Sequence, residues 1–288
     1  MFYQVIALLL WSSAFIAAKY SYTMMDPLMM LLFRLGIAAL LVLPPCLRYW
    51  RTIERRYWPG LLWLSFLNYV VVLALQFWGL KFTSAASTST IAGLEPLLTV
   101  FIGHFFFHDR AEWYHWLCGL LAFIGVALLI AGGGEGGNIS LLGCLMVLGG
   151  GVVFCATLRP TQKMIAAIGA PAFTSLSMGV APLLCLPVSL LLAEDLHIGW
   201  NLPGTLGLLY LGVCCSWLSY TCWNKGMTSV SSNVSGMLTA SEPIFGTLLA
   251  VLILGERISA MSLAGVVLVI SATVGSVVMP KWLVRQRV

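Results

Sequence analysis

Charged side chains are scarce in this chain. Asp, Glu, Lys and Arg make up 9% of its 288 residues, whereas a soluble globular domain carries about 25%. Hydrophobic residues make up 60% of the chain, and the mean hydropathy is +0.97. These values exclude a soluble globular protein. The apolar runs are long and continuous rather than alternating, so they predict membrane-spanning α-helices in contact with lipid and not barrel strands.

Several other signals are missing as well. The eight cysteines include no CxxC pair and mostly lie within apolar runs, so we interpret them as small core residues. His104 and His108 are four residues apart, but no acid or cysteine cluster accompanies them, and no metal site is predicted. The sequence contains no phosphate-binding loop and no paired nucleophile and base, so we expect neither enzyme activity nor a cofactor. The first apolar run, 2–20, lacks a basic start and a small-residue cleavage site, and we interpret it as a retained helix.

Ten apolar segments of about 20 residues are each long enough to cross a hydrocarbon core of about 30 Å. We predict spans at 3–20, 28–47, 61–80, 84–107, 113–131, 139–158, 172–192, 204–223, 231–254 and 261–280. The connectors between them are short and rich in turn residues, and none is long enough to form a soluble domain.

The positions of the basic residues predict the orientation of the spans. If the N-terminus is cytoplasmic, only Lys81 and Arg257 lie outside, while Lys19 and Arg34 lie within spans. The other basic residues then lie inside: Arg48, Arg51, Arg55, Arg56, Arg110, Arg159, Lys163, Lys225, Lys281, Arg285 and Arg287. This asymmetry is typical of the positive-inside rule and predicts that both termini are cytoplasmic. It also accounts for the net charge of +5, so no nucleic-acid partner is expected.

The two halves of the chain repeat each other. The pairs Glu95-Pro96 and Glu242-Pro243 are 147 positions apart, and the same offset relates Gly79 to Gly226, Ser84 to Ser231 and Arg110 to Arg257. We therefore divide the chain into two five-helix repeats, 1–137 and 138–288. Because five is an odd number, the second repeat must cross the membrane in the opposite direction. Inverted repeats around a central cavity are typical of secondary transporters that work by alternating access.

Each Glu-Pro pair lies in the middle of a long apolar segment. An ionisable side chain there costs roughly 2.5–3.5 kcal/mol on insertion scales, so it indicates a function. Proline removes a backbone donor and opens the helix, which makes Pro96 and Pro243 candidate hinges. Glu95 and Glu242 are candidate ligands for substrate or for a coupled proton. The alternative is that both carboxyl groups only accept hydrogen bonds that fix the bend.

Further candidates lie in the other spans. Arg34, deep in the second span, is a candidate partner for a substrate carboxylate or a glutamate, whereas Lys19 can extend to the interface. The remaining candidate substrate-binding residues are amides and aromatics: Trp11, Asn68, Tyr69, Gln76, Trp78, Trp217, Tyr220 and Asn224. Such side chains suit a pocket for uncharged or zwitterionic solutes. The alternative is that the amides join helices and Trp78 belongs to an interfacial belt.

The chain resembles the EamA family of the drug/metabolite transporter (DMT) superfamily. The resemblance rests on Ile6-Ala-Leu-Leu-Leu-Trp-Ser-Ser-Ala-Phe, on Phe33-Arg34, and on the stretches that lead to Glu95-Pro96 and from Met227 through Glu242-Pro243 to Leu254-Gly-Glu-Arg257. It implies an all-α integral membrane protein with ten helices, a central cavity, and export of small metabolites across the bacterial inner membrane.

The substrate class stays open at this stage. Amino acids or related compounds are the first expectation, and efflux of drugs or toxic compounds is the alternative. Two acids near the membrane midplane leave coupling to protons open, and the sequence does not indicate an oligomeric state. The seventh span contains no counterpart to Arg34, so the two halves are not chemically equivalent there.

Overall fold

The computed structural model describes residues 2–132, 139–230, 234–235 and 238–285. These residues form helices and connectors, with no extended sheet among the described ranges. The helices are α1 (Phe2–Ser21), α2 (Pro27–Trp50), α3 (Trp58–Ser65), α4 (Val72–Lys81), α5 (Ala85–Ala92), α6 (Glu95–Phe107), α7 (Trp113–Gly132), α8 (Leu141–Ile168), α9 (Ala170–Leu192), α10 (Leu202–Tyr210), α11 (Ser219–Gly226), α13 (Glu242–Leu254) and α14 (Ala260–Arg285).

Eight helical segments in the described part of the chain are long and apolar enough to cross a membrane, and α13 and residues 260–276 of α14 are shorter apolar helices. A helix satisfies its own backbone hydrogen bonds, which is why long apolar runs take this form in lipid. The protein is therefore an all-helical, multi-pass membrane protein. Ten complete crossings remain a prediction, because the predicted segment 231–254 lies partly outside the described residues.

Two of the long segments contain a π-helical stretch. Residues Phe66–Val71 join α3 to α4, and residues Leu211–Leu218 join α10 to α11. A shift of the first stretch by the repeat offset of 147 gives 213–218, which falls inside the second stretch. π-Helical turns loosen the regular hydrogen-bond ladder and are frequent at functional sites.

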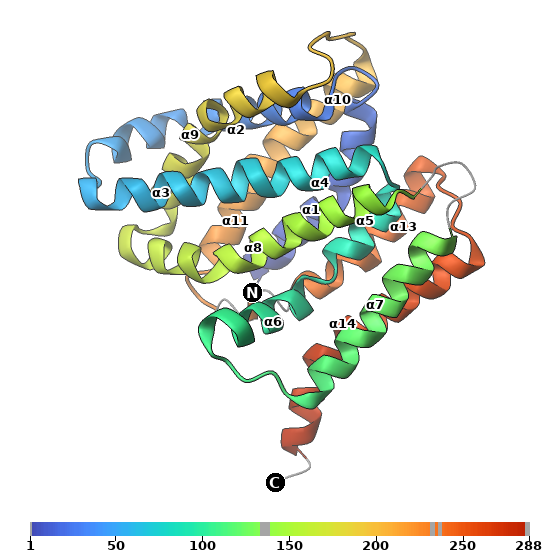
Figure 1. The fold of residues 1–288 in the computed structure, drawn as a ribbon. Helices are drawn as coiled ribbons and strands as arrows, with labels where there is room; N and C mark the ends of the chain where they lie inside the picture. The colour runs from blue at the N-terminus through green and yellow to red at the C-terminus, as the bar shows by residue number, and fades with distance from the viewer. Residues whose placement is uncertain (1, 133–138, 231–233, 236–237, 286–288) are drawn as a thin grey trace.

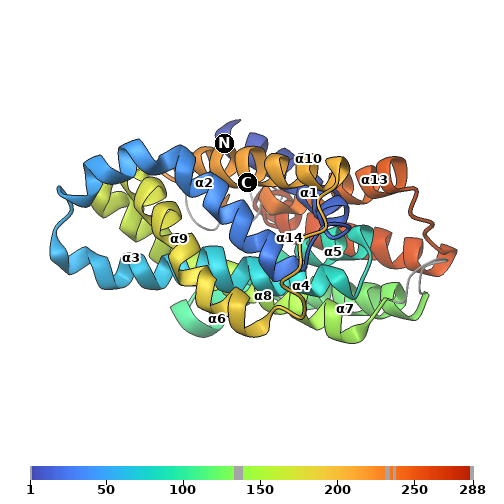
Figure 2. The same cartoon turned by 90° about the horizontal axis from the view of Figure 1, so that it is seen from above.

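The helices pack in defined pairs (Figures 1 and 2). α7 packs along α14, α2 along α9, α4 along α8 and α5 along α13, while α1 contacts α10, α11 and α13. α7 and α14 pack through glycines: a Cβ added to Gly265 would lie 2.7 Å from the backbone nitrogen of Leu129, and one added to Gly125 would lie 2.9 Å from the carbonyl oxygen of Gly265. Close backbone approach through small residues is typical of helix pairs in membranes.

The connectors gather at two opposite ends of the bundle. At the Asp26 end, the connector 22–26 bonds to the connector 193–201 through Gly199 N and Met24 O, 2.9 Å apart. The Glu256 carboxylate at this end accepts hydrogen bonds from Ala85 N at 2.8 Å and Ala86 N at 3.0 Å, and so caps α5. At the Asp109 end, Asp109 pairs with Arg159 of α8. Successive long helices therefore alternate in direction.

One predicted boundary is wrong. The sixth span was expected to end at residue 158, with Arg159 and Lys163 in a connector, but α8 continues to Ile168 with Pro160 inside it. The charge of Arg159 does not end the helix because its guanidinium pairs with Asp109 and lies over the Phe107 ring, 4.5 Å from the centroid. Such partners lie far away in the chain and cannot be recognised from the local sequence.

Candidate functional site

Both Glu-Pro pairs begin a new helix. α5 ends at Ala92, and α6 begins with Glu95 and carries Pro96 in its first turn. In the second half, a 3₁₀ turn at Thr239–Ser241 precedes α13, which begins with Glu242 and Pro243. Proline is tolerated in a first turn because its missing N–H would have no partner there. The interruption therefore lies just before each glutamate, and the role of the prolines as hinges remains a prediction.

The two interruptions lie against each other. The backbone of Gly93, in the turn before α6, is so close to the ring of Pro243 that no Cβ would fit. Cys155 donates from Sγ to the carbonyl oxygen of Glu95 at 3.3 Å, and Ser12 donates to the carbonyl oxygen of Glu242 at 3.4 Å. Both acidic residues are thus placed in the middle of the bundle by contacts between the two halves of the chain.

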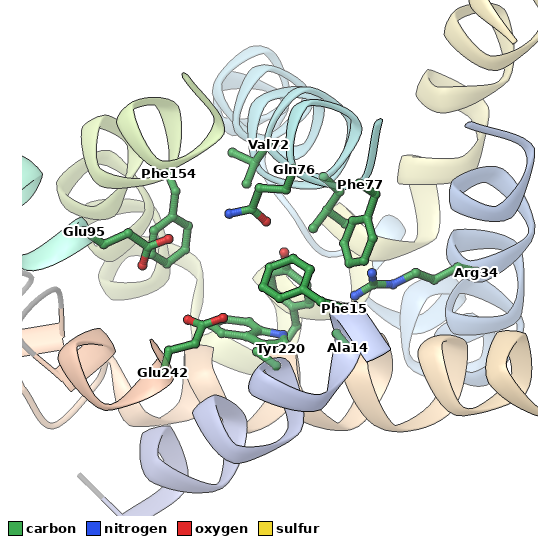
Figure 3. Close-up of a pocket in the computed structure, with 12 residues that line it drawn as sticks. Ala14, Phe15, Arg34, Val72, Gln76, Phe77, Glu95, Phe154, Tyr220 and Glu242 are labelled. Carbon is green, nitrogen blue, oxygen red and sulfur yellow. The ribbon is translucent and has the colours of Figure 1, made fainter. Parts of the chain in front are cut away.

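The central cavity lies between these glutamates and Arg34 (Figure 3). It has a volume of about 30 Å³, which is room for a few water molecules, whereas a metabolite needs a pocket of roughly 300 Å³ or more. In this structure the cavity is therefore too small to hold a metabolite. The lining side chains are Trp11, Ala14, Phe15, Arg34, Val72, Leu73, Gln76, Phe77, Glu95, Phe154, Tyr220 and Glu242.

Two hydrogen bonds and one aromatic contact fix the Arg34 guanidinium. Its side chain is 1% exposed. Nε donates to Ser216 Oγ at 2.6 Å, Nη2 donates to Cys215 O at 3.2 Å, and the guanidinium lies 4.7 Å from the centroid of the Phe77 ring. Nη1 has no hydrogen-bond partner among the described residues. A buried donor without a partner is costly, and it is suited to a ligand oxygen.

The two carboxyl groups occupy the opposite side of the cavity. Glu95 is 4% and Glu242 is 5% exposed, and Figure 3 shows both side chains pointing into the space beside Tyr220 and Phe154. Two buried carboxylates in one site repel each other and lose hydration, so the pair favours a bound proton or a cationic group.

The predicted candidates are divided between two cavities. Six of them line the central cavity: Trp11, Arg34, Gln76, Glu95, Tyr220 and Glu242. Asn68, Tyr69 and Asn224 line a neighbouring cavity that also contacts Tyr220. Trp78 and Trp217 line neither of these cavities, and both are partly buried.

Some lining residues were not predicted from the sequence. Phe15, Phe77 and Phe154 form much of the cavity wall. They give no separate signal in a chain that is 60% hydrophobic. Ser216, in the predicted eighth span, does not line the central cavity itself, but its hydroxyl fixes Arg34.

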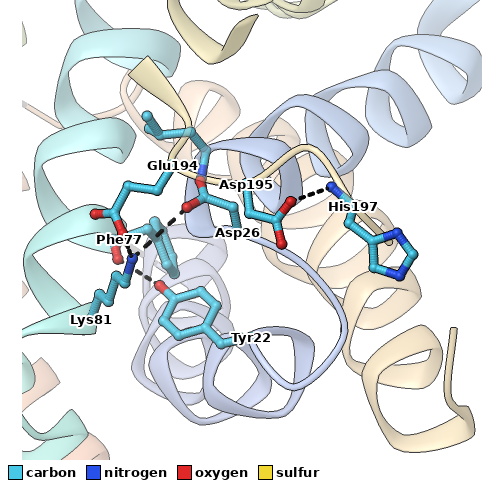
Figure 4. Close-up of polar contacts among 8 residues, drawn as sticks. Tyr22, Asp26, Phe77, Lys81, Glu194, Asp195 and His197 are labelled. Carbon is cyan, nitrogen blue, oxygen red and sulfur yellow. Dashed lines mark hydrogen bonds and ion pairs between the residues drawn. The ribbon is translucent and has the colours of Figure 1, made fainter. Parts of the chain in front are cut away.

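A vestibule lies at the Asp26 end (Figure 4). It has a volume of about 360 Å³, and Tyr22, Asp26, Lys81, Glu194 and Asp195 contribute to its lining. Lys81 Nζ lies 2.6 Å from Glu194 Oε2 and 3.9 Å from Asp26 Oδ2, so it joins the end of α4 to two connectors. These connectors would have to separate if the central cavity opened at this end.

Tyr22 links the vestibule to the central cavity. Its hydroxyl donates to the carbonyl oxygen of Phe77 at 2.6 Å, and the Phe77 ring lines the central cavity beside Arg34. Burial raises the pKa of Tyr22 well above its usual range, Arg34 opposes this shift and Asp26 adds to it. The phenol therefore keeps the proton that it donates.

Lys19 does not extend freely to the interface. Its Nζ donates to the carbonyl oxygens of Leu80 at 3.0 Å and Thr83 at 2.8 Å. These carbonyls lie at the C-terminal end of α4, where the helix leaves acceptors without internal partners and where positive charge is favourable. Lys19 is therefore a helix-capping residue at the Asp26 end.

The described part of the chain contains no group of three or more His, Cys, Asp or Glu residues that could hold a metal ion. His104 uses Nδ1 to contact the carbonyl oxygen of Asp109 at 2.9 Å. This contact gives the imidazole a structural role beside the turn that follows α6.

The fold and the site define a multi-pass membrane protein with a buried, charged cavity at paired helix breaks. The model of the EamA-like transporter family matches residues 1–131 and 141–278, and the chain belongs to this family. An uncharacterized transporter of Haemophilus influenzae is 52% identical over 142 residues, which are 48% of this chain and 84% of that protein.

Two further comparisons extend this result. A protein of Salmonella typhimurium named a probable amino-acid metabolite efflux pump is 29% identical over 208 residues, 69% of each chain. A crystal structure shares the fold with a TM-score of 0.69 over 96% of this chain and 97% of that chain, at 18% identity.

Proposed function

We propose that this protein is a secondary transporter that exports amino acids or closely related zwitterionic metabolites across the bacterial inner membrane. One observation carries the proposal. Arg34, whose Nη1 lacks a partner among the described residues, and the carboxyl pair of Glu95 and Glu242 lie at opposite sides of one aromatic-lined cavity. An α-amino acid has a carboxylate and an ammonium group that complement these two sides.

The roles of the individual groups follow from this arrangement. Arg34 Nη1 binds the substrate carboxylate, and one or both glutamates accept the ammonium group. When the substrate leaves, the carboxyl pair takes up a proton, which would couple export to proton entry. The relative that is named a probable amino-acid metabolite efflux pump supports this substrate class.

Alternating access is supported by the packing of the two halves. If the five segments of each half are numbered in order, α2 with α9, α5 with α13 and α7 with α14 join equivalent segments. α4 belongs to the third segment of the first half, and α8 is the first segment of the second half. The equivalent pair with the halves exchanged is α11 with α1, and both pairs are in contact. This pattern and the corresponding π-helical stretches support an inverted repeat, and the distribution of basic residues supports a cytoplasmic position for both termini.

Export of lipophilic cations is a second candidate. The cavity wall contains Phe15, Phe77 and Phe154 beside the two carboxyl groups, and aromatic faces with nearby negative charge attract such cations. In this case Arg34 would repel the substrate rather than bind it, so the two candidates predict opposite effects of its removal.

Counterflow in proteoliposomes tests the proposal. Vesicles loaded with a mixture of unlabelled amino acids are diluted into each labelled amino acid in turn, and vesicles loaded with unlabelled tetraphenylphosphonium are diluted into the labelled cation. We expect transient accumulation of at least one amino acid and none of the cation. Accumulation of the cation alone would favour the second candidate, and accumulation of neither would contradict both.

A further inference from the structure

A second cavity lies beside the central one. We call it the inner chamber, and its volume is about 10 Å³, room for about one water molecule. Its lining includes Asn68, Tyr69, Phe154, Thr161, Tyr220 and Asn224. Phe154 and Tyr220 also line the central cavity, so the two cavities are neighbours that share these two rings as a wall.

The inner chamber has no charged residue in its lining, and two amides and a threonine hydroxyl lie among its apolar and aromatic side chains. Asn68 accepts from Thr157 Oγ1 at 2.8 Å and donates to Thr161 Oγ1 at 3.2 Å. Asn224 donates to Thr174 Oγ1 at 3.0 Å. These amides and hydroxyls can exchange their present partners for a ligand with amide, hydroxyl or carbonyl groups, which costs less than leaving them unpaired.

An aromatic partition separates the two cavities. We define it as Trp11, Phe154, Tyr220 and Trp223. The ring centroids of Trp11 and Tyr220 are 5.0 Å apart, those of Trp11 and Trp223 are 5.1 Å apart, and those of Phe154 and Trp223 are 5.8 Å apart. Rings at these distances are in contact, and they lie between the central cavity, which Gln76 lines, and the inner chamber, which Thr161 lines.

The partition is attached to both π-helical stretches. Trp11 donates from Nε1 to the carbonyl oxygen of Cys215 at 3.0 Å, which lies in the stretch 211–218. Tyr220 donates from its hydroxyl to the carbonyl oxygen of Asn68 at 3.5 Å, which lies in the stretch 66–71. A return of either stretch to regular α-helix would redirect the carbonyl that holds a ring.

The inner chamber lies toward the Asp109 end. Thr161 follows Arg159, which pairs with Asp109. Gln162 donates from Nε2 to the carbonyl oxygens of Met227 at 3.2 Å and Val230 at 2.7 Å. The chamber therefore lies on the Asp109 side of the aromatic partition, beside this part of α8.

We propose that the aromatic partition is the inner gate of the central cavity and that the inner chamber is an entry subsite for the uncharged hydrogen-bonding groups of a substrate. This inference rests on the proposed transport function for its direction of travel. A solute from the cytoplasm exchanges hydrogen bonds in the chamber first, and it reaches Arg34 and the glutamates only after the rings have moved.

Thiol labelling tests the gate without a known substrate. All eight native cysteines are replaced, and single cysteines are introduced by Thr161→Cys in the chamber or Gln76→Cys in the central cavity. The membrane-impermeant reagent 2-(trimethylammonium)ethyl methanethiosulfonate is added to inside-out vesicles. We expect Thr161→Cys to react about tenfold faster than Gln76→Cys, because a closed state that is favoured by one or two hydrogen bonds is populated by about that ratio.

The partition is then weakened. Trp11→Phe removes the bond to Cys215, and Tyr220→Ala removes a ring. Each is expected to raise the labelling rate of Gln76→Cys about fivefold or more and to leave that of Thr161→Cys unchanged. Phe123→Ala, a change of an exposed aromatic in α7 outside the partition and both π-helical stretches, is the control. Elution as a monodisperse peak shows that each variant is folded. If Tyr220→Ala does not fold, Trp11→Phe alone still tests the gate.

Three outcomes would overturn the inference. The first is equal labelling of the two reporters with the partition intact. The second is no change at Gln76→Cys in a folded partition variant. The third is reaction of Thr161→Cys only from the opposite membrane face. Because no substrate is used, failure here is distinct from failure of the counterflow assay, which tests transport of amino acids itself.

Discussion

Ser216 Oγ lies 2.6 Å from Nε of Arg34 and fixes the guanidinium so that Nη1 remains available to the central cavity. The arrangement joins the second helix of one half to a π-helical stretch of the other. An arginine placed only for packing would have all its donors satisfied by the protein. A residue that is 1% exposed and keeps one donor without a partner among the described residues is instead prepared for an anionic ligand group.

The first prediction concerns Arg34. Arg34→Lys keeps the charge but removes the planar fork, so we expect affinity for the transported amino acid to fall roughly tenfold to a hundredfold, the loss of a hydrogen bond to a charged group. Ligand-induced thermal shift measures it. Arg56→Lys, at an exposed site on the Asp109 side of the bundle, is the control. Unchanged affinity, or improved binding of tetraphenylphosphonium, would contradict the assignment and favour a cationic substrate.

The second prediction concerns the carboxyl pair. If Glu95 and Glu242 exchange a proton for the substrate, the rate of export depends on pH, and Glu95→Gln combined with Glu242→Gln abolishes both export and its pH dependence. Each single variant is expected to bind the substrate more weakly and to lose the coupling of export to proton entry. Efflux from loaded proteoliposomes in acidic and alkaline buffers measures these effects.

Glu112→Gln is the matched control for the carboxyl pair, because Glu112 is exposed in the connector before α7. A double glutamine variant that still exports with the pH profile of the wild type would show that the two acids only fix the helix breaks. That outcome would not change the description of the fold, but it would rule out a role for the two glutamates in proton coupling.

Much of the arrangement around the glutamates could be predicted from the sequence. The offset between the two Glu-Pro pairs predicted equivalent positions, and the structure places each glutamate at the first residue of a helix of 13 residues. Proline restricts where a helix can continue, and buried charge requires a partner, so both signals are local. For the same reasons Arg34 could be recognised as a cavity residue before its partner Ser216 was known.

Other features have no local signal. The π-helical stretches consist of ordinary residues. Their carbonyl groups accept hydrogen bonds from Tyr220 and Trp11, which are distant in the sequence. The aromatic lining cannot be distinguished from core in a chain with so many hydrophobic residues. The end of α8 was misplaced because the partner of Arg159 is 50 residues away in the sequence.

The third prediction concerns Lys81. Its contacts with Glu194 and Asp26 join α4 to two connectors at the vestibule. The closer pair, Lys81 with Glu194, is partly exposed, and such ion pairs contribute only about 0–1 kcal/mol to stability. We therefore expect Lys81→Met to change the melting temperature little but to raise labelling of Gln76→Cys from the Asp26 side severalfold. High salt should have a similar effect on the wild type because it screens the pair. Lys225→Met is the control, and Lys81→Glu combined with Glu194→Lys should restore slow labelling.

The prediction that Lys81 restricts access at the Asp26 end is wrong if Lys81→Met leaves labelling from the Asp26 side unchanged at low salt, or if the exchanged pair behaves like the single variant. Equal acceleration by Lys225→Met would point to a general loosening of the bundle. The labelling reagent is the same one that tests the inner gate, so the two ends of the cavity can be compared in one set of variants.

The last prediction concerns the glycines that join α7 and α14. A Cβ at Gly265 would lie 2.7 Å from the Leu129 nitrogen, and backbone cannot give way as a side chain can. Gly265→Ala is expected to lower the free energy of unfolding by about 1–3 kcal/mol, the usual cost of overpacking. Gly36→Ala in α2 is the matched control, because a Cβ there meets nothing within 4 Å. It should be neutral or slightly stabilising, since alanine favours helix over glycine by about 1 kcal/mol. Thermal unfolding of both variants in detergent measures the difference, and equal melting temperatures would show that α7 and α14 separate easily and do not pack as one unit.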